Sequence, residues 1–266
     1  MLFRSTLLNA LPEWALVVIF AAVPVLLAVG GLLFLRRFFA GWRDESSSQV
    51  VLAATAIVMT LFALLLALVV VDLHGSHNGA SNGVGEEGNS LNKIEQDADA
   101  FPNAPKASVE KAVADYIVEV REHEFPALRA GREDGMAEQK LLRISTALRG
   151  YTPETQTQIT FYDSAVAQVN DLVTQRHSRV MAAESSVPGA LVALLLVLAV
   201  VSIGTSLFLK THHPGLDLIL IVSLAAVVGL ALATALILEY PFSGSVAVSS
   251  EPLVHGPLGQ LVQQYR

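Results

Sequence analysis

Four long stretches without any charged residue or histidine constrain this chain more than any other feature. They cover residues 14–35, 50–71, 188–209 and 218–238, and each is 21 or 22 residues long. A helix of about 20 residues spans the ~30 Å hydrocarbon layer of a bilayer. The 41 charged residues, 17 Lys and Arg with 24 Asp and Glu, all lie in the rest of the 266-residue chain. This distribution predicts an integral membrane protein that crosses the bilayer four times.

The second stretch, VVLAATAIVMTLFALLLALVVV, has the composition of a stable membrane helix. Its fourteen Val, Leu, Ile and Phe residues favour insertion by about 4–8 kcal/mol in total. The alternative, a helix buried in a large soluble core, would require more amphipathic partner sequence than the chain contains. The first stretch lacks the short apolar core and cleavage site of a signal peptide and ends at Arg36 and Arg37, so we expect it to be retained.

The predicted fold is all-α: four transmembrane helices arranged as two hairpins, with a soluble helical insert between spans 2 and 3. The expected parts are an N-terminal hairpin (1–71), the insert (72–187), a C-terminal hairpin (188–238) and a tail (239–266). The insert carries the whole net charge of −7, which argues against nucleic acid as a partner. Glycine-rich sequence at its start predicts a flexible linker over residues 73–107.

Apolar residues at helical spacing predict three helices within residues 108–187. The first begins with Ser108 as N-cap and buries Val109, Val113, Tyr116, Ile117 and Val120, until Pro126 ends or kinks it. The second covers residues 136–149 and presents Leu141, Leu142, Ile144 and Leu148, with Gly150 as its stop. The third begins with Thr152 as N-cap and Pro153 at its first position, and packs through Ile159, Tyr162, Val166, Val169, Val173 and Val180.

Lys and Arg residues close to the spans predict the orientation of the chain. The two hairpin turns carry Arg36, Arg37, Arg43 and Lys210, whereas the opposite side carries only Arg4, Arg176 and Arg179 close to a span. We therefore expect a protein of the cell membrane with both termini and the insert outside the cytoplasm. The chain has no Cys, which rules out disulfides but is compatible with either side.

The sequence contains no recognisable catalytic motif, and we expect neither enzyme activity nor a cofactor. His74 and His77 lie near Glu86 and Glu87, and these side chains are potential metal ligands. A glycine-rich linker is a poor preorganised cage, however, and structural zinc sites usually have four ligands, so we predict no metal site. The residues Glu122, His123 and Glu124 are interpreted as the solvated face of a helix.

The spans contain no ionisable residue, so a proton-coupled transporter is not expected. Small residues at a spacing of four, Ala225, Gly229 and Ala233, predict close helix packing within one chain or between copies. A pore would have to be a hydrophobic constriction. Candidates to line it are four residues on one face of the second span: Thr55, Met59, Phe62 and Leu66.

The segment after the last span, LILEYPFSGSVAVSSEPL, resembles the C-terminal signature of a bacterial membrane family that is described as bestrophin-like. The signature residues are Pro241, Phe242, Ser243 and Gly244. The segments DYIVEVREHEFPAL (115–128) and HHPGLDLIL (212–220) are also similar to this family. The chain departs from the pattern in its glycine-rich stretch, where a charged helical continuation is expected, and in a tail that is one residue short.

The resemblance implies a domain of unknown function, and comparison with bestrophins suggests an oligomeric anion channel. From the residues alone, we predict a membrane scaffold or sensor whose insert binds a protein partner. The alternative is a bestrophin-like oligomeric channel. The expected partners are the lipid bilayer, further copies of the chain in the channel alternative, and an unidentified protein for the insert.

Overall fold

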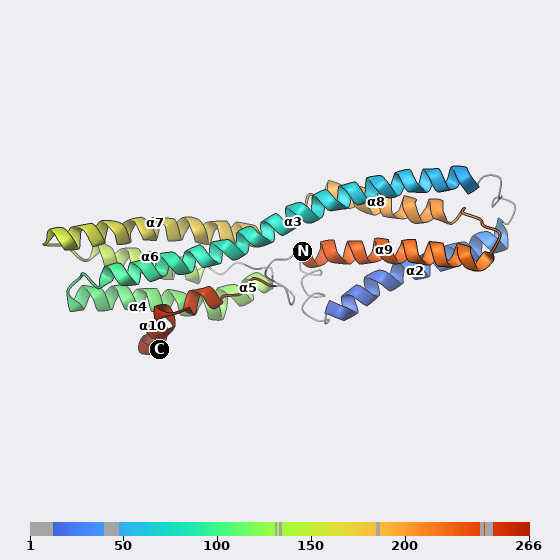
Figure 1. The fold of residues 1–266 in the computed structure, drawn as a ribbon. Helices are drawn as coiled ribbons and strands as arrows, with labels where there is room; N and C mark the ends of the chain where they lie inside the picture. The colour runs from blue at the N-terminus through green and yellow to red at the C-terminus, as the bar shows by residue number, and fades with distance from the viewer. Residues whose placement is uncertain are drawn as a thin grey trace. The chain divides into compact units, whose positions relative to one another are not determined.

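The computed structural model describes residues 13–39, 48–130, 132, 135–184, 187–239, 242 and 247–266 (Figure 1). This part of the chain is helical and contains no strand, which agrees with the all-α prediction. The elements in chain order are α2 (Glu13–Phe38), α3 (Ser48–Ala98), α4 (Asn103–Glu119), the π-helical turn η3 (Val120–Glu124), α5 (Phe125–Arg129), α6 (Met136–Arg149), α7 (Gln156–Glu184), α8 (Gly189–Ser206), α9 (Pro214–Leu238), the 3-10 turn η4 (Glu251–Val254) and α10 (Pro257–Tyr265).

The four predicted spans correspond to helices that are long and apolar enough to cross a membrane: α2, the first part of α3, α8 and α9. The chain divides into two compact units. The membrane unit contains the described parts of residues 8–75 and 186–239, and the helical module contains those of 76–185 and 240–266. The C-terminal tail therefore folds with the insert.

Within the membrane unit, the most extensive helix contact is between α2 and α9. Ala28 and Leu32 of α2 pack on Ile221 and Ala225 of α9. A second apolar cluster joins α3 to α8 and α9 through Phe62, Val69, Leu73, Leu195, Ala199 and Val228. The first span thus packs on the fourth and the second on the third and fourth, so the predicted pairing into two hairpins does not describe the closest contacts.

Polar contacts at one end of the membrane unit reinforce this packing. The Arg36 guanidinium donates to the carbonyl oxygen of Pro214 at 3.1 Å and lies 3.6 Å from the buried carboxylate of Asp217. Asp217 also accepts a hydrogen bond from the backbone N–H of Thr211 at 2.7 Å. Because Asp217 lies in the first turn of α9, its negative charge is further stabilised by the helix dipole.

The glycine-rich segment is helical, and the prediction of a flexible linker over residues 73–107 was wrong. Helix α3 continues without interruption to Ala98 and is 51 residues long, about 76 Å at 1.5 Å per residue. Its glycines each cost about 1 kcal/mol of helix propensity. Burial of apolar side chains between them offsets that cost, since Ala80, Val84, Leu91 and Ile94 are at most 2% exposed.

Two of the predicted helix starts were also wrong, for local reasons. Helix α4 begins at Asn103 with Pro102 as its N-cap residue, ahead of the predicted cap at Ser108. Its first turn accommodates Pro105, since no helical partner is needed there. Helix α7 begins at Gln156, and its cap is Thr155, whose hydroxyl accepts from the N–H of Gln158 while the Gln158 side chain accepts from that of Thr155. This reciprocal capping box replaces the predicted start at Thr152.

The core of the helical module largely follows the predicted apolar faces. All five residues predicted for the first helix are fully buried, and the predicted bounds of the second, Met136 and Arg149, are those of α6. Leu142, Ile159 and Val173 are exposed, contrary to prediction. On α7 the buried face instead passes through Ala165, Val169 and Leu172, and it continues into charged residues.

Candidate functional site

The most unusual feature of the helical module is a cluster of charged side chains at its centre. It begins on α3, where one face buries Ala80, Val84, Leu91 and Ile94. Glu87 lies on the same face, one turn from Val84 and from Leu91, and is 0% exposed. A carboxylate in such a position must be paired, because an isolated buried charge is strongly destabilising.

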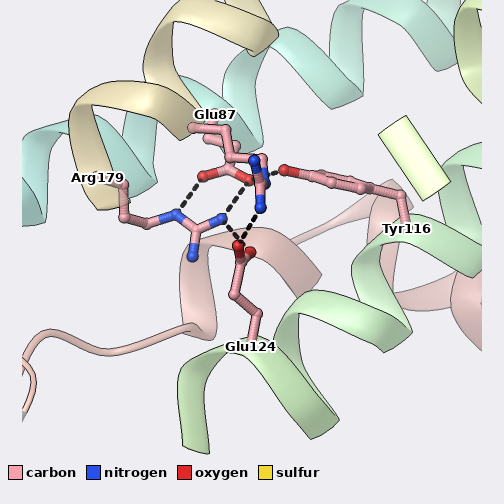
Figure 2. Close-up of polar contacts among 5 residues, drawn as sticks. Glu87, Tyr116, Glu124 and Arg179 are labelled. Atoms are coloured by element: carbon pink, nitrogen blue, oxygen red, sulfur yellow. Dashed lines mark hydrogen bonds and ion pairs between the residues drawn. The ribbon is translucent and has the colours of Figure 1, made fainter. Parts of the chain in front are cut away.

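Helix α7 supplies the partner, Arg179, which is also 0% exposed. Its Nε donates to Glu87 Oε2 at 2.8 Å, and its Nη2 donates to Glu87 Oε1 at 3.2 Å and to Glu124 Oε2 at 2.8 Å (Figure 2). Arg176, one turn earlier, donates to the other oxygen of Glu124 at 2.6 Å. The planar guanidinium suits this geometry, since it can donate to two carboxylates in one plane. We call Glu87, Glu124, Arg176 and Arg179 the ionic clasp.

Glu124 reaches the clasp because the helix that carries it contains a π-helical turn, which holds about one residue more than a turn of α-helix. The N–H of Phe125 donates to the carbonyl of Val120, five residues back, which defines the π-helical turn η3. Pro126 explains this widening: it has no N–H, and its ring would clash with the carbonyl four residues earlier in a regular helix. The sequence predicted that Pro126 ends or kinks the helix, and the structure instead continues through η3 into α5 with both Val120 and Glu124 buried.

Tyr116 of α4 completes the hydrogen bonding. Its hydroxyl donates to Glu87 Oε1 at 2.5 Å, as Figure 2 shows. Burial raises the pKa of Tyr116 well above its usual value, and the neighbouring Glu87 carboxylate raises it further. Tyr116 is therefore a neutral hydrogen-bond donor at physiological pH.

The clasp is electrically balanced, with two carboxylates and two guanidinium groups. Burial disfavours the charged form of Arg179, but the carboxylates of Glu87 and Glu124 outweigh this effect and raise its pKa, so it stays protonated. Such a closed network has no side chain available as a general base. Its chemistry is that of a connector that holds α3, η3 and α7 together in one register.

Two aromatic rings continue the clasp toward the C-terminal tail. The Arg179 guanidinium carbon lies 5.2 Å from the centroid of the Phe125 ring, a cation–π contact. Phe125 in turn packs edge-on against Phe242, with centroids 5.8 Å apart. Phe242 is 2% exposed and is the only residue of the predicted Pro241, Phe242, Ser243, Gly244 signature that lies within the described residues.

A second tail contact involves the neighbour of Glu87. A Cβ atom at Gly88 would lie 2.7 Å from the carbonyl oxygen of Pro252, so only glycine permits this approach of the tail to α3. Pro252 belongs to the segment LILEYPFSGSVAVSSEPL, which carried the family resemblance. Leu253, the next residue, is fully buried in the core of the module.

The residues predicted to line a pore lie on the interior face of α3. Phe62 is 2% exposed, Thr55 is buried, and Met59 and Leu66 pack against the cluster that joins α3 to α8 and α9. A single chain therefore covers this face with its own helices. A role in pore lining stays a prediction.

The small residues of the fourth span lie on the face of α9 that contacts α2. A Cβ atom at Gly229 would lie 2.2 Å from the carbonyl oxygen of Phe20, and Ala225 and Ala233 are buried. In this structure these residues serve packing within one chain. Such close backbone approach is typical of helix pairs in membranes.

The described residues contain no group of three or more His, Cys, Asp or Glu side chains placed to hold a metal ion. His74, His77 and Glu86 lie on α3 without such a grouping, and Glu87 is committed to Arg179 and Tyr116.

Sequence reasoning missed the clasp because it assigned Glu124 to a solvated face and used Arg176 and Arg179 only to predict orientation. A signal was present in the spacing. Arg176 and Arg179 continue the helical spacing of Val169 and Leu172, and Glu87 occupies the apolar face of α3. Charged residues at core positions of two helices indicate a buried ion pair.

Comparison with known families identifies the chain. No curated protein and no solved structure matches it. A family model described as the bestrophin-like domain matches residues 22–253, from the first span through the Pro252 contact. The match includes every residue of the clasp. The chain therefore belongs to the bestrophin-like family of membrane proteins.

Proposed function

We propose that this protein is a non-enzymatic membrane scaffold or sensor whose helical module binds a protein partner. The observation that carries the proposal is the packing of α3 in the membrane unit. The face that could have lined a pore is covered by α8 and α9 through Phe62, Leu195 and Val228. An apolar interior of this kind offers an ion no path through a single chain.

The hydroxyl groups of the membrane unit support the same interpretation. Ser202 and Ser206 of α8 are buried, and each donates to a carbonyl of its own helix at 2.7 Å. Thr60 and Thr234 do the same on α3 and α9. Hydroxyls engaged in this way do not form a continuous polar lining.

Exposed apolar side chains on the helical module support a partner-binding role. Ile159, Phe161 and Val173 of α7 are 38–47% exposed, and Leu142 of α6 is 56% exposed. The module has its own core, so these residues are not needed to complete it. Photo-crosslinking tests this surface: a crosslinker at Val173 should give one defined adduct in cells, and the same group at the polar position Glu154 should give none.

The mass of the detergent-solubilised protein, corrected for bound detergent, tests the proposal against conduction. A monomer or dimer is expected for the scaffold, because neither provides a central axis for a pore. A closed ring of copies would instead favour the alternative, a bestrophin-like oligomeric anion channel. The family match is the observation from which this alternative is drawn.

For localisation we propose the cell membrane, with both termini and the helical module outside the cytoplasm. The absence of native Cys makes this directly testable, since single Cys variants provide unique labels. An impermeant thiol reagent added to intact cells should label a Cys at Glu154 and not one at Lys210. The reverse pattern would invert the orientation.

A further inference from the structure

The C-terminal tail, here Phe242 and residues 247–266, contacts residues next to the ionic clasp at two separate points. Phe242 packs edge-on against Phe125, whose ring also contacts the Arg179 guanidinium. Pro252 lies against Gly88, the residue after Glu87. Both tail residues belong to the stretches that carried the family resemblance, and each touches a neighbour of a clasp residue.

We propose that the tail is a latch for the clasp: it keeps water from Arg179, so that detaching the tail weakens the hold of α7 on α3. The burial of the clasp and of the tail residues supports such a seal. Glu87, Glu124 and Arg179 are all 0% exposed, and Phe242, Val248 and Leu253 are at most 3% exposed. Buried charges attract one another strongly because water, with its high dielectric constant, is excluded.

One atom of the clasp makes exclusion of water especially important. Nη1 of Arg179 is buried and has no hydrogen-bond partner among the described residues. Such a donor gains a partner as soon as water enters, which favours an opened state over the closed one. The tail therefore holds closed a site whose own hydrogen bonding is incomplete.

Further contacts attach the end of the tail to the helices around the clasp. Leu258, Leu261 and Val262 of α10 are buried in the module core. The Tyr265 hydroxyl donates to Glu110 at 2.8 Å, and Arg266 pairs with Glu122 at 2.9 Å in an exposed position. The clasp connects α3 and α7, and α3 is itself one continuous helix with the second span, so the latch acts on a helix that enters the membrane.

Gly88→Ala tests the latch in the full-length chain, with Gly85→Ala as the matched control. The added Cβ at Gly88 would lie 2.7 Å from a backbone oxygen of the tail, whereas a Cβ at Gly85 meets nothing within 4 Å. Both changes raise helix propensity on α3, so loss of the helix does not confuse the result. Phe242→Ala is the second variant, since it removes the other contact.

The measurement is hydrogen–deuterium exchange of the protein in lipid nanodiscs at low and at high salt. In the wild type and in Gly85→Ala, peptides that carry Glu87 or Arg179 should exchange equally slowly at both salt concentrations, because buried pairs are poorly screened. In Gly88→Ala, the tail peptide 248–262 should exchange several-fold faster, and the clasp peptides should become faster and salt-dependent. Phe242→Ala should give the same change in the clasp peptides.

Two results would overturn the proposal. Faster exchange of the tail with unchanged clasp peptides at both salt concentrations would mean that the tail covers the module without controlling the clasp. Unchanged exchange of the tail in Gly88→Ala would mean that the Pro252 contact is no point of attachment.

Discussion

The two compact units of this protein treat polar groups in opposite ways. In the membrane unit, the buried clusters are apolar, and hydroxyls such as that of Ser202 donate to their own helix. In the helical module, four charged side chains meet at the centre and link three helices. Both units are all-helical, so the difference lies in what fixes one helix against another.

The contrast follows from the surroundings of each unit. An ionisable side chain inside a bilayer costs several kcal/mol, so close packing of small residues replaces ion pairs along the spans, and the Arg36–Asp217 pair lies at one end of the unit. In the module, charges are buried from water, and the cost is recovered only when every group is paired. A buried ion pair contributes little net stability but penalises any register that leaves a charge unpaired. We therefore interpret the clasp as a network that selects one arrangement of α3, η3 and α7.

The largest expected effect comes from breaking the clasp with Arg179→Met. The change leaves the carboxylate of Glu87 buried without its cation, which should destabilise the module by about 3–5 kcal/mol. Denaturant unfolding of the full chain, followed by hydrogen exchange of module peptides, measures this loss. Arg143→Met, at an exposed arginine on α6, should change stability by at most about 0.5 kcal/mol. Equal stability of the two variants would refute the clasp as an organising element.

The corresponding test in the membrane unit is Gly229→Ala. The added methyl group would lie 2.2 Å from the Phe20 carbonyl oxygen and should separate α2 from α9, at a cost of about 1–3 kcal/mol. Unfolding in detergent by increasing SDS provides the measurement. Gly30→Ala on α2 is the matched control, since its Cβ meets nothing within 4 Å, and a similar loss there would argue against close packing as the cause.

A smaller effect is expected from Tyr116→Phe, which removes the hydrogen bond to Glu87. The loss should be about 1–2 kcal/mol near pH 7, since the acceptor is charged but keeps its bonds to Arg179. The pKa of Tyr116 is raised in the folded state, so its stabilising contribution is complete below the unfolded pKa of about 10 and is lost as pH rises above it.

Thermal unfolding between about pH 8 and 11 checks the sign of this dependence. The wild-type module should lose stability toward the alkaline end, and the Phe variant should lose less over the same range. Parallel curves for the two proteins would mean that Tyr116 does not titrate on unfolding.

The smallest effect is expected at the exposed end of the module. Arg266→Gln removes an ion pair with Glu122 in which the side chains are 70% and 46% exposed. Pairs in water contribute little, so thermal unfolding should be nearly unchanged. A loss of stability comparable to that of Tyr116→Phe would show that this exposed ion pair stabilises the module as much as a buried contact of the clasp does.

The sequence predicted best those features that depend on local composition and periodicity. The four apolar helices, the bounds of α6 and the buried face of α4 through Val109, Val113 and Ile117 were all correct. The helical state of the glycine-rich segment was missed, because tertiary packing of residues such as Val84 and Ile94 outweighs low propensity.

The spacing could indicate buried charges, but which residues pair in the clasp could not be inferred because its members are far apart in sequence. Glu87 and Arg179 are separated by 92 positions, and the sequence around either residue does not identify its partner. The family resemblance did cover Tyr116, Glu124 and Phe125 within the segment 115–128. Their shared role became visible only when π-helical geometry at Pro126 brought Glu124 into the core.

The central claim is that the apolar interior of the membrane unit does not conduct ions. The most direct test is anion flux from liposomes that contain a known number of copies of the protein. Chloride release should be no faster than from empty liposomes, and Phe62→Ala should not increase it. Chloride release that rises with the number of copies, and rises further in Phe62→Ala, would contradict the scaffold and establish a pore along α3.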